Sequence, residues 1–324
     1  LTGLAAVATV AAAASEQRAL FIGNSFSYAH GGVWVQYATI SQSCVPGLHV
    51  LTTADAVAAR TLTMATGGTA ATAVAKGRYD LLVLQDQSDL MLGGTRPIRS
   101  FFAPEARKHN ATVGLYQTWA KPWEENFTSS TLLRVRAYAA YASAAREAGA
   151  QVLTARAGEA FLEVLRRCCG GDTDDPTFNA LYDSDQEHPS ALGVNLVAWV
   201  MTFAFNTAAR HCDASKVPLV PGQSSRQRRE FFEVACELAG LCTAAPKLSR
   251  QPLCGTASAL QGKWERRRLS LEAGCHGGEL PKDCYIAEEW QVHGTDVHFS
   301  RGLSGTQNLH SLRVRNYGKQ ALRG

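Results

Sequence analysis

The sequence lacks a strong charge of either sign. Its 324 residues hold 32 Lys and Arg against 28 Asp and Glu, which gives a formal net charge of +4 at pH 7. Proteins that bind nucleic acids usually gather a larger basic surplus on one surface to match the phosphates. The weak, dispersed surplus therefore argues against a nucleic-acid partner.

The sequence also lacks an internal repeat and the composition of a disordered or collagen-like chain. It is 46% hydrophobic and 19% charged, with 28 Gly and 11 Pro, as is typical of globular proteins. At roughly 150 residues per domain, such a length predicts two domains or one large one.

One segment without charge resembles a membrane span. Residues 191–209 contain no charged side chain, but they include Asn195 and Asn206. A spanning helix needs about 20 predominantly apolar residues. We expect a buried helix packed on a sheet here, and no integral membrane span.

An initiator methionine and a basic leading region are also missing. Residues 1–14 are apolar and rich in Ala, and the chain turns polar at Ser15. This pattern resembles the apolar core and cleavage region of a signal peptide. We expect residues 1–17 to be a signal-peptide remnant in a fragment or processed form, with an N-terminal helix as the alternative.

Cysteine is the residue present in unusual number. Nine cysteines exceed what a cytosolic enzyme usually carries. Two Asn-x-Thr sequons begin at Asn110 and Asn126, as in glycoproteins. Together these features predict a secreted or secretory-pathway protein with disulfides.

Short apolar runs alternate with helical patterns up to about residue 210. The expected strands are residues 19–22, 49–52, 81–84, 112–116 and 151–154, and the expected helices between and after them are residues 32–43, 68–76, 98–108, 131–148 and 158–167. Such alternation predicts an α/β fold, a three-layer α/β/α sandwich with about five parallel strands. Ligands bind at the carboxyl ends of such strands.

The regular alternation of strand and helix patterns ends near Arg210. A further helix is expected from Arg226 to Leu238, and few periodic elements follow Gly240. We place a domain boundary there, which divides residues 18–240 from a Cys- and Trp-containing C-terminal module, residues 241–324, of unknown function.

The cysteines bear on this boundary. Five precede residue 241 and four follow it. Because five cysteines cannot all pair among themselves, we expect a free thiol or a bridge across the boundary. The adjacent pair Cys168 and Cys169 is where we expect the cysteine without a partner in its own domain. Zinc is less expected than disulfides in the tail, because no Cys-x-x-Cys pair supports it.

Ser25 is the candidate nucleophile. It follows the first expected strand within Gly23-Asn24-Ser25 and precedes a glycine pair. A serine on such a turn exposes its hydroxyl at the sheet edge, where a following helix N-terminus favours a developing oxyanion. A turn or cap serine has the same local pattern.

His188 is the candidate base. It stands three residues after Asp185 and just before Pro189 and Ser190, which suit the start of a helix. Asp185 at that spacing can fold back onto one ring nitrogen and leave the other as a base, which completes a Ser-His-Asp triad with Ser25. Asp183 and Glu187 are the competing carboxylates.

Two further oxyanion donors are expected. Gly68 opens a helix, and a glycine there lets its N–H approach a ligand closely. Gln85 ends the apolar strand and offers a side-chain amide, with Gln87 as the alternative. Trp119 and Trp123 lie on the same side and either stack on a sugar ring or anchor loops.

These blocks in this order resemble the SGNH (GDSL-like) hydrolase superfamily over residues 18–240. The resemblance rests on Gly23-Asn24-Ser25, Gly68, Gln85-Asp86-Gln87-Ser88-Asp89 and Asp185-x-x-His188. The first block has Asn in place of the commoner Asp, and the third lacks Gly-x-Asn-Asp and is closer to the block of carbohydrate acetylesterases.

The resemblance implies a flavodoxin-like fold and an esterase that needs no metal or other cofactor. Ser25 attacks an ester carbonyl, His188 takes its proton, and Asp185 orients His188. The backbone N–H groups of Ser25 and Gly68 and the amide of Gln85 hold the oxyanion.

The leading hypothesis is a secreted serine esterase acting on acyl esters of a carbohydrate, with acetyl as the expected acyl group. The alternatives are a lipid or lysophospholipid esterase on the same fold, and a carbohydrate-binding protein without catalysis. The natural substrate and the oligomeric state are not predicted, because loops set specificity.

Overall fold

The computed structural model describes residues 15–88, 93–242, 289–292, 295–298 and 313–316. The chain divides into two compact units, Leu1–Thr256 and Ala257–Gly324. Each unit is described by itself.

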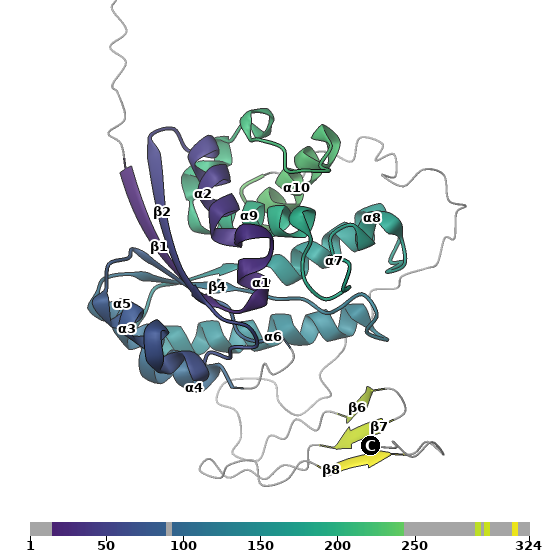
Figure 1. Cartoon of the computed structure of the whole chain (residues 1–324), viewed down its shortest axis with the longest axis horizontal. Coiled ribbons are helices and arrows are strands. Elements are labelled where there is room, and N and C mark those ends of the chain that lie inside the picture. Colours follow the sequence, from purple (N-terminus) through teal and green to yellow (C-terminus); the bar gives the residue numbers. More distant parts are fainter. Residues whose placement is uncertain (1–14, 89–92, 243–288, 293–294, 299–312, 317–324) are drawn as a thin grey trace, which may run out of the picture. The chain divides into compact units, whose positions relative to one another are not determined.

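The first unit is built on a five-stranded parallel sheet (Figure 1). Its strands, in chain order, are β1 (Ser15–Gly23), β2 (Leu48–Ala56), β3 (Leu81–Leu84), β4 (Thr112–Tyr116) and β5 (Val152–Ala155). In space their order is β2-β1-β3-β4-β5, and every neighbouring pair is parallel. The predicted α/β fold with five parallel strands is confirmed.

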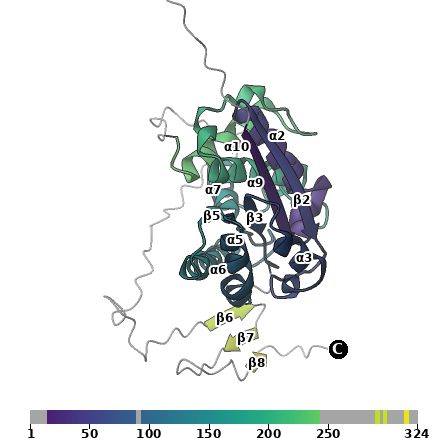
Figure 2. The same ribbon diagram turned by 90° about the vertical axis from the view of Figure 1, so that its left-hand side faces the viewer.

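Helices cover both faces of this sheet, as Figures 1 and 2 show. One face carries α2 (Val33–Cys44), α7 (Ala157–Cys168), α9 (Ala191–Phe205) and α10 (Ser225–Leu238); the other carries α3 (Gly68–Lys76), α5 (Ala103–Lys108) and α6 (Phe127–Glu147). Successive residues of β1 serve the two layers in turn: Phe21 packs into one core, and Leu20 and Ile22 into the other. This alternation explains why the second half of β1 is apolar throughout.

Shorter helical turns connect these elements. They are α1 (Ser25–Tyr28), η1 (Ala29–Gly31), η2 (Met64–Thr66), α4 (Thr95–Pro97), η3 (Ile98–Phe102), α8 (Pro176–Asn179), η4 (Thr207–His211) and η5 (Ala214–Lys216). The expected helix over residues 98–108 is split into the π-helical turn η3 and α5. Pro104 explains the split, because proline has no N–H and clashes with the carbonyl four residues before it.

The uncharged segment forms the buried helix α9, as predicted. Its side chains Leu196, Val197, Trp199 and Met201 are almost completely buried. The regular helix ends at Phe205, and the expected continuation to residue 209 is the separate turn η4. Within the described residues, no helix has both the length and the apolar character needed to cross a membrane.

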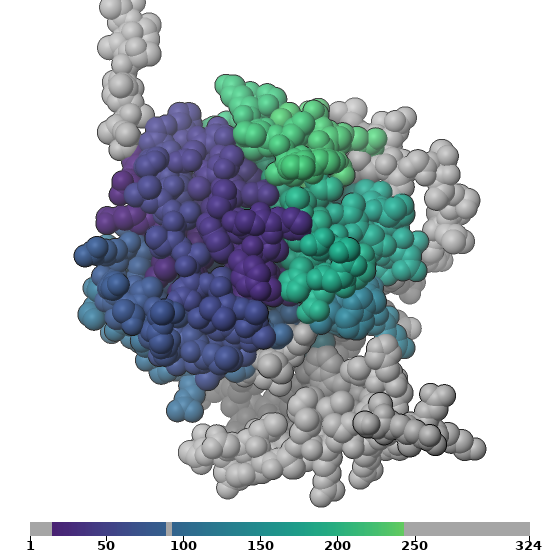
Figure 3. Space-filling model, in the orientation of Figure 1, coloured from purple at the N-terminus to yellow at the C-terminus, as the bar shows by residue number. Residues whose placement is uncertain are grey.

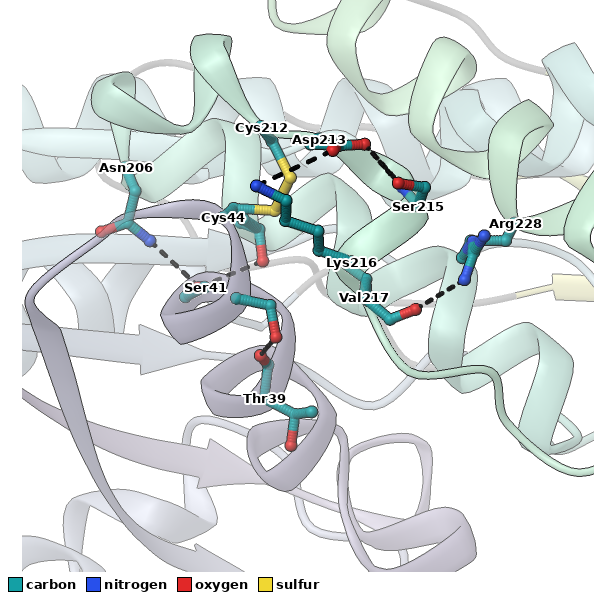
Figure 4. The surroundings of a disulfide bond; sticks show 12 residues. Thr39, Ser41, Cys44, Asn206, Cys212, Asp213, Ser215, Lys216, Val217 and Arg228 are labelled. Atoms are coloured by element: carbon teal, nitrogen blue, oxygen red, sulfur yellow. Dashed lines mark hydrogen bonds and ion pairs between the residues drawn. A yellow bond between two sulfur atoms is a disulfide. The ribbon is translucent and has the colours of Figure 1, made fainter.

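Two disulfides occur among the described residues. Cys44 at the end of α2 is bonded to Cys212 after η4, where Asp213, Ser215 and Lys216 lie close by (Figure 4). Cys236 is bonded to Cys242, so that a bridge spans the predicted boundary at Gly240.

Cys168 and Cys169 are buried free thiols. The pKa of Cys169 is raised mainly by a hydrogen bond with Cys168 and, to a smaller extent, by burial. The free thiols foreseen from the odd cysteine count are therefore present at the expected pair, whereas Cys236 and Cys242 both lie within the first unit.

β1 starts at Ser15, so residues 15–17, which the sequence placed with the leading segment, pair with β2. Residues 1–14 lie outside the described residues, as do Cys254, Cys275 and Cys284.

In the second unit, β6 (Glu289–Val292), β7 (Thr295–His298) and β8 (Arg313–Asn316) form an antiparallel sheet in the order β6-β7-β8.

Candidate active site

The order in which successive strands are added to the sheet changes side at β1. It leaves β1 for β2 on one side and returns to β3 on the other. Ser25 lies two residues after the end of β1, and Gln85 directly follows β3, where its N–H donates to the carbonyl of Ile22 at 2.9 Å. Sheets of this type bind ligands at such a switch point, beyond the carboxyl ends of the strands.

Asn24 builds the turn that presents Ser25. Its Oδ1 accepts the N–H of Phe26 at 3.2 Å and caps α1, while its Nδ2 donates to the carbonyl of Arg60 at 3.1 Å. An aspartate makes the first bond but cannot donate the second. The Asn in this block therefore has a structural reason, because it ties the nucleophile turn to the loop after β2.

Gly23 allows this turn to pack closely. A Cβ at Gly23 would lie 2.3 Å from Ser27 Oγ and 2.7 Å from Gln85 Oε1. Ser25 itself is partly exposed at the first position of α1, where the helix does not use its N–H. Its hydroxyl and its amide are thus available at one end of the sheet.

Asp185 and His188 form a hydrogen-bonded pair. His188 Nδ1 lies 2.6 Å from Asp185 Oδ2, and the backbone N–H groups of His188 and Glu187 bond Asp185 Oδ1 at 3.0 and 2.9 Å. Burial alone would raise the pKa of Asp185, but the bonds from His188 and Glu187 outweigh it and lower the pKa to about 2. The ionised carboxylate thus holds the proton on Nδ1, which makes Nε2 the basic nitrogen.

The two competing carboxylates have other partners. Asp183 Oδ2 lies 3.2 Å from His30 Nε2, and Glu187 Oε1 lies 3.0 Å from Lys121 Nζ. Asp185 is therefore the carboxylate that faces His188.

The chain segments of Ser25 and His188 meet. The ring of Phe26, next to Ser25, lies 5.6 Å from the His188 ring, centroid to centroid. In Figure 3 the purple segment near the N-terminus and the teal segment that precedes and enters α9 lie side by side on this face. Within the described residues, Ser25 Oγ makes no hydrogen bond to His188; bonds of this kind often tighten only when a substrate is present.

Gly68 lies at the start of α3 with its backbone in the left-handed region, at a φ of +64°. A Cβ would meet nothing within 4 Å, so backbone conformation and not space calls for glycine there. The loop before α3 is held at the sheet edge, because Leu62 N–H donates to Asp86 Oδ1 at 2.9 Å. Gly68 is exposed, and its N–H belongs to the first turn of α3, where the helix itself does not use it.

Gln85 does not fit the expected role of oxyanion donor. It is only 1% exposed, and its Oε1 accepts from Asn24 N–H and Ser27 Oγ, both at 2.9 Å. Its Nε2 donates to the carbonyl of Asp86. Both ends of the Gln85 amide are thus hydrogen-bonded inside the protein. The expectation that Gln85 donates to the oxyanion is therefore wrong, and the candidate donor is the alternative, Gln87, which is partly exposed.

Asp86 is a site residue that sequence reasoning missed. Its carboxylate accepts from Leu62 N–H and Gln87 N–H, both at 2.9 Å, and from Tyr141 Oη at 2.7 Å. Burial raises the pKa of Asp86, against the lowering effect of these bonds. An acidic residue two positions after the end of the fully apolar strand Leu81–Leu84 is the sequence signal that could have identified this buried carboxylate.

The two tryptophans differ. Trp119 is fully buried, and its ring stacks on Phe161 with 3.8 Å between centroids. The expectation that it stacks on a sugar is therefore wrong, because the indole forms part of the core beneath Phe26. Trp123 is 56% exposed, with Lys121 Nζ 5.2 Å from its ring centroid.

No protein-family model matches the chain, and a search of curated proteins finds no match. Structural comparison finds esterases. One is Axe2, an acetylxylan esterase from Geobacillus stearothermophilus, at 15% identity over 60% of this chain and 94% of that one, with a TM-score of 0.43. Another is the psychrotrophic esterase EstA from Pseudoalteromonas sp., at 12% identity over 59% and 97% of the two chains, with a TM-score of 0.41.

Proposed function

We propose that this chain is a serine ester hydrolase of the SGNH type. The observation that carries the proposal is the bonded pair of Asp185 and His188, which lies beside the turn of Ser25 at the switch point of the sheet. A serine hydroxyl is a weak nucleophile at neutral pH and needs an oriented base, which this pair supplies.

The reaction uses the residues as follows. His188 Nε2 takes the proton of Ser25 Oγ as that oxygen attacks the ester carbonyl, and Asp185 stabilises the imidazolium that forms. His188 then protonates the leaving alcohol. Water, activated by His188 in the same way, hydrolyses the acyl-enzyme and frees Ser25.

Three donors hold the oxyanion in this proposal. They are the backbone N–H groups of Ser25 and Gly68 and the side chain of Gln87, which replaces Gln85. Each such donor is worth about 100- to 1000-fold in rate when it is aimed at the developing charge.

The substrate class that we propose is an acetyl ester of a carbohydrate. Its support is the third sequence block, which is closer to that of carbohydrate acetylesterases, and the exposed ring of Trp123. A flat aromatic face suits the apolar face of a sugar ring.

We also propose that the hydrolase unit enters the secretory pathway. Two disulfides support this, as do the exposed sequon residues Asn110 and Asn126. Disulfides persist mainly in oxidising compartments.

The test is hydrolysis of a chromogenic acetate ester by the wild-type chain and by Ser25→Ala, His188→Ala and Asp185→Asn. Each substitution removes a part of one catalytic unit, so the rate is expected to fall at least about 1000-fold in each variant. Equal rates for wild type and Ser25→Ala contradict the proposal and favour a binding protein without catalysis.

A second series tests the substrate class. Release of acetate from an acetylated oligosaccharide is compared with hydrolysis of esters that have longer acyl chains. Preference for the acetylated sugar is expected. Faster turnover of long-chain esters contradicts the carbohydrate assignment and favours a lipid esterase.

A further inference from the structure

The loop that carries the base needs an external support. Asp185 and His188 both lie on the loop between Tyr182 and Pro189, so their 2.6 Å bond fixes the ring only relative to that loop. The position of His188 relative to Ser25 depends on contacts between the loop and other segments.

The loop itself is a compact unit. Its ends are joined by the bridge between Tyr182 and Pro189 and by the Asp183 N–H, which donates to the carbonyl of His188 at 2.8 Å. Gln186 N–H donates to the carbonyl of Asp183 at 2.9 Å. A loop closed in this way moves as one body, so a few external contacts are enough to place it.

Two side-chain pairs hold that body from different segments. His30 lies just after α1, the helix that begins with Ser25, and its Nε2 is 3.2 Å from Asp183 Oδ2. Lys121 lies in the loop after β4, and its Nζ is 3.0 Å from Glu187 Oε1, next to the base. One pair therefore connects the loop directly to the nucleophile segment, and the other supports it from β4.

His30 has a left-handed backbone conformation. Its φ of 48° and ψ of 45° lie in the left-handed region, which a non-glycine residue adopts at a cost. Gly31 and Gly32 follow with φ of 83° and 100° and complete the reversal of the chain. A glycine adopts this backbone conformation without that cost, so His30→Gly can remove the imidazole without straining the turn.

On the basis of the proposed hydrolase, we propose that His30 and Lys121 are positioning residues, which hold the His188 loop over Ser25 through Asp183 and Glu187. The His30 and Asp183 side chains are 35% and 48% exposed, and exposed pairs contribute little to folding stability. Their removal therefore changes the placement of His188 more than the stability of the fold.

The experiment uses the full chain with His30→Gly, Asp183→Asn and the double variant. His30→Gly keeps the left-handed backbone and removes only the imidazole. We expect kcat for a chromogenic acetate to fall about 10- to 100-fold, as small misplacements of catalytic groups do, with KM within about twofold and no fall in the unfolding midpoint. The double variant is expected to lose no more than the stronger single variant, because both act through one contact.

The controls separate positioning from other effects. His30→Gln restores a donor at similar reach and is expected to recover part of kcat. Arg99→Gln removes an exposed pair with Glu147, 2.6 Å apart, at the end of α6 that leads toward the start of β5, and is expected to leave kcat unchanged. Lys121→Met and Glu187→Gln test the second pair by kcat, with the unfolding midpoint measured beside it because the Lys121 side chain is only 12% exposed.

Hydrogen exchange gives a readout that does not need activity. The amides of Asp183 and Gln186 are expected to exchange about tenfold faster in His30→Gly than in wild type, because the loop opens more often. Unchanged exchange, unchanged kcat or additive losses overturn the positioning proposal. A wild-type chain without Ser25-dependent hydrolysis contradicts the hydrolase instead, while the exchange rates still decide whether the loop is held.

Discussion

Gln85 and Gln87, two residues apart after β3, have different environments. Gln85 is buried and links the nucleophile turn to the end of β3 through bonds to Asn24, Ser27 and Asp86. Gln87 is partly exposed on the next part of the same loop. A side chain that already satisfies buried groups is poorly suited to respond to a charge that develops on a substrate.

Substitution of the two glutamines separates stability from catalysis. Gln85→Ala leaves Asn24 N–H and Ser27 Oγ without their acceptor, and is expected to lower the free energy of unfolding by about 1 to 3 kcal/mol. Gln87→Ala is expected to lower kcat about 100- to 1000-fold, as loss of an oxyanion donor does. Urea unfolding and ester hydrolysis measure the two effects, and the reverse assignment of losses would return Gln85 to the oxyanion site.

At the scale of elements, the start of α9 anchors the loop that carries Asp185 and His188. Ser190 caps it by accepting the N–H groups of Leu192 and Gly193, both at 3.2 Å, and donates its own hydroxyl to the carbonyl of Ala180 at 2.6 Å. The first turn of this helix is thereby joined to the segment that enters the loop.

Gly193 sets how closely these two elements approach. A Cβ there would lie 2.1 Å from the carbonyl oxygen of Leu181, a backbone atom that cannot move independently. Gly193→Ala is expected to lower the free energy of unfolding by about 1 to 3 kcal/mol, as overpacking does, and to lower kcat as well, because the shift reaches His188.

The control for this substitution is Gly93→Ala, whose Cβ would meet only Thr63 Oγ1, at 3.4 Å. Thermal unfolding and ester hydrolysis of both variants test the prediction. Wild-type stability and kcat in Gly193→Ala would show that the helix and the loop adjust independently of each other.

At the scale of the whole molecule, the two disulfides constrain very different lengths of chain. Cys44 and Cys212 are 168 residues apart and connect the end of α2 to the segment after α9, whereas Cys236 and Cys242 are only 6 residues apart. The long bridge therefore restricts the unfolded chain far more.

Removal of each bridge by paired Cys→Ala substitution tests this difference. In the loop-entropy account, loss of the long bridge lowers the free energy of unfolding by about 5 kcal/mol and loss of the short one by about 2 kcal/mol. Guanidinium unfolding measures both. Equal losses would mean that local packing and not chain length decides what the bridges contribute.

The sheet and its helices could be predicted because their patterns are local. The expected strands at residues 81–84 and 112–116 coincide with β3 and β4, and the expected helix at residues 68–76 coincides with α3. The turns η1 and α8 were not predicted, because three or four residues do not establish a hydrophobic period.

The sequence by itself determined the α/β fold, the place of Ser25 after the first strand and the Asp-x-x-His spacing of Asp185 and His188, since each follows from local order along the chain. Only the tertiary structure decided that Gln85 and Trp119 are buried, that Asp86 accepts a hydrogen bond from Leu62 N–H, and that Asp183 faces His30. Burial and pairing depend on which segments, far apart in the sequence, come into contact. The spacing of residues within a segment does not determine which other segment it contacts.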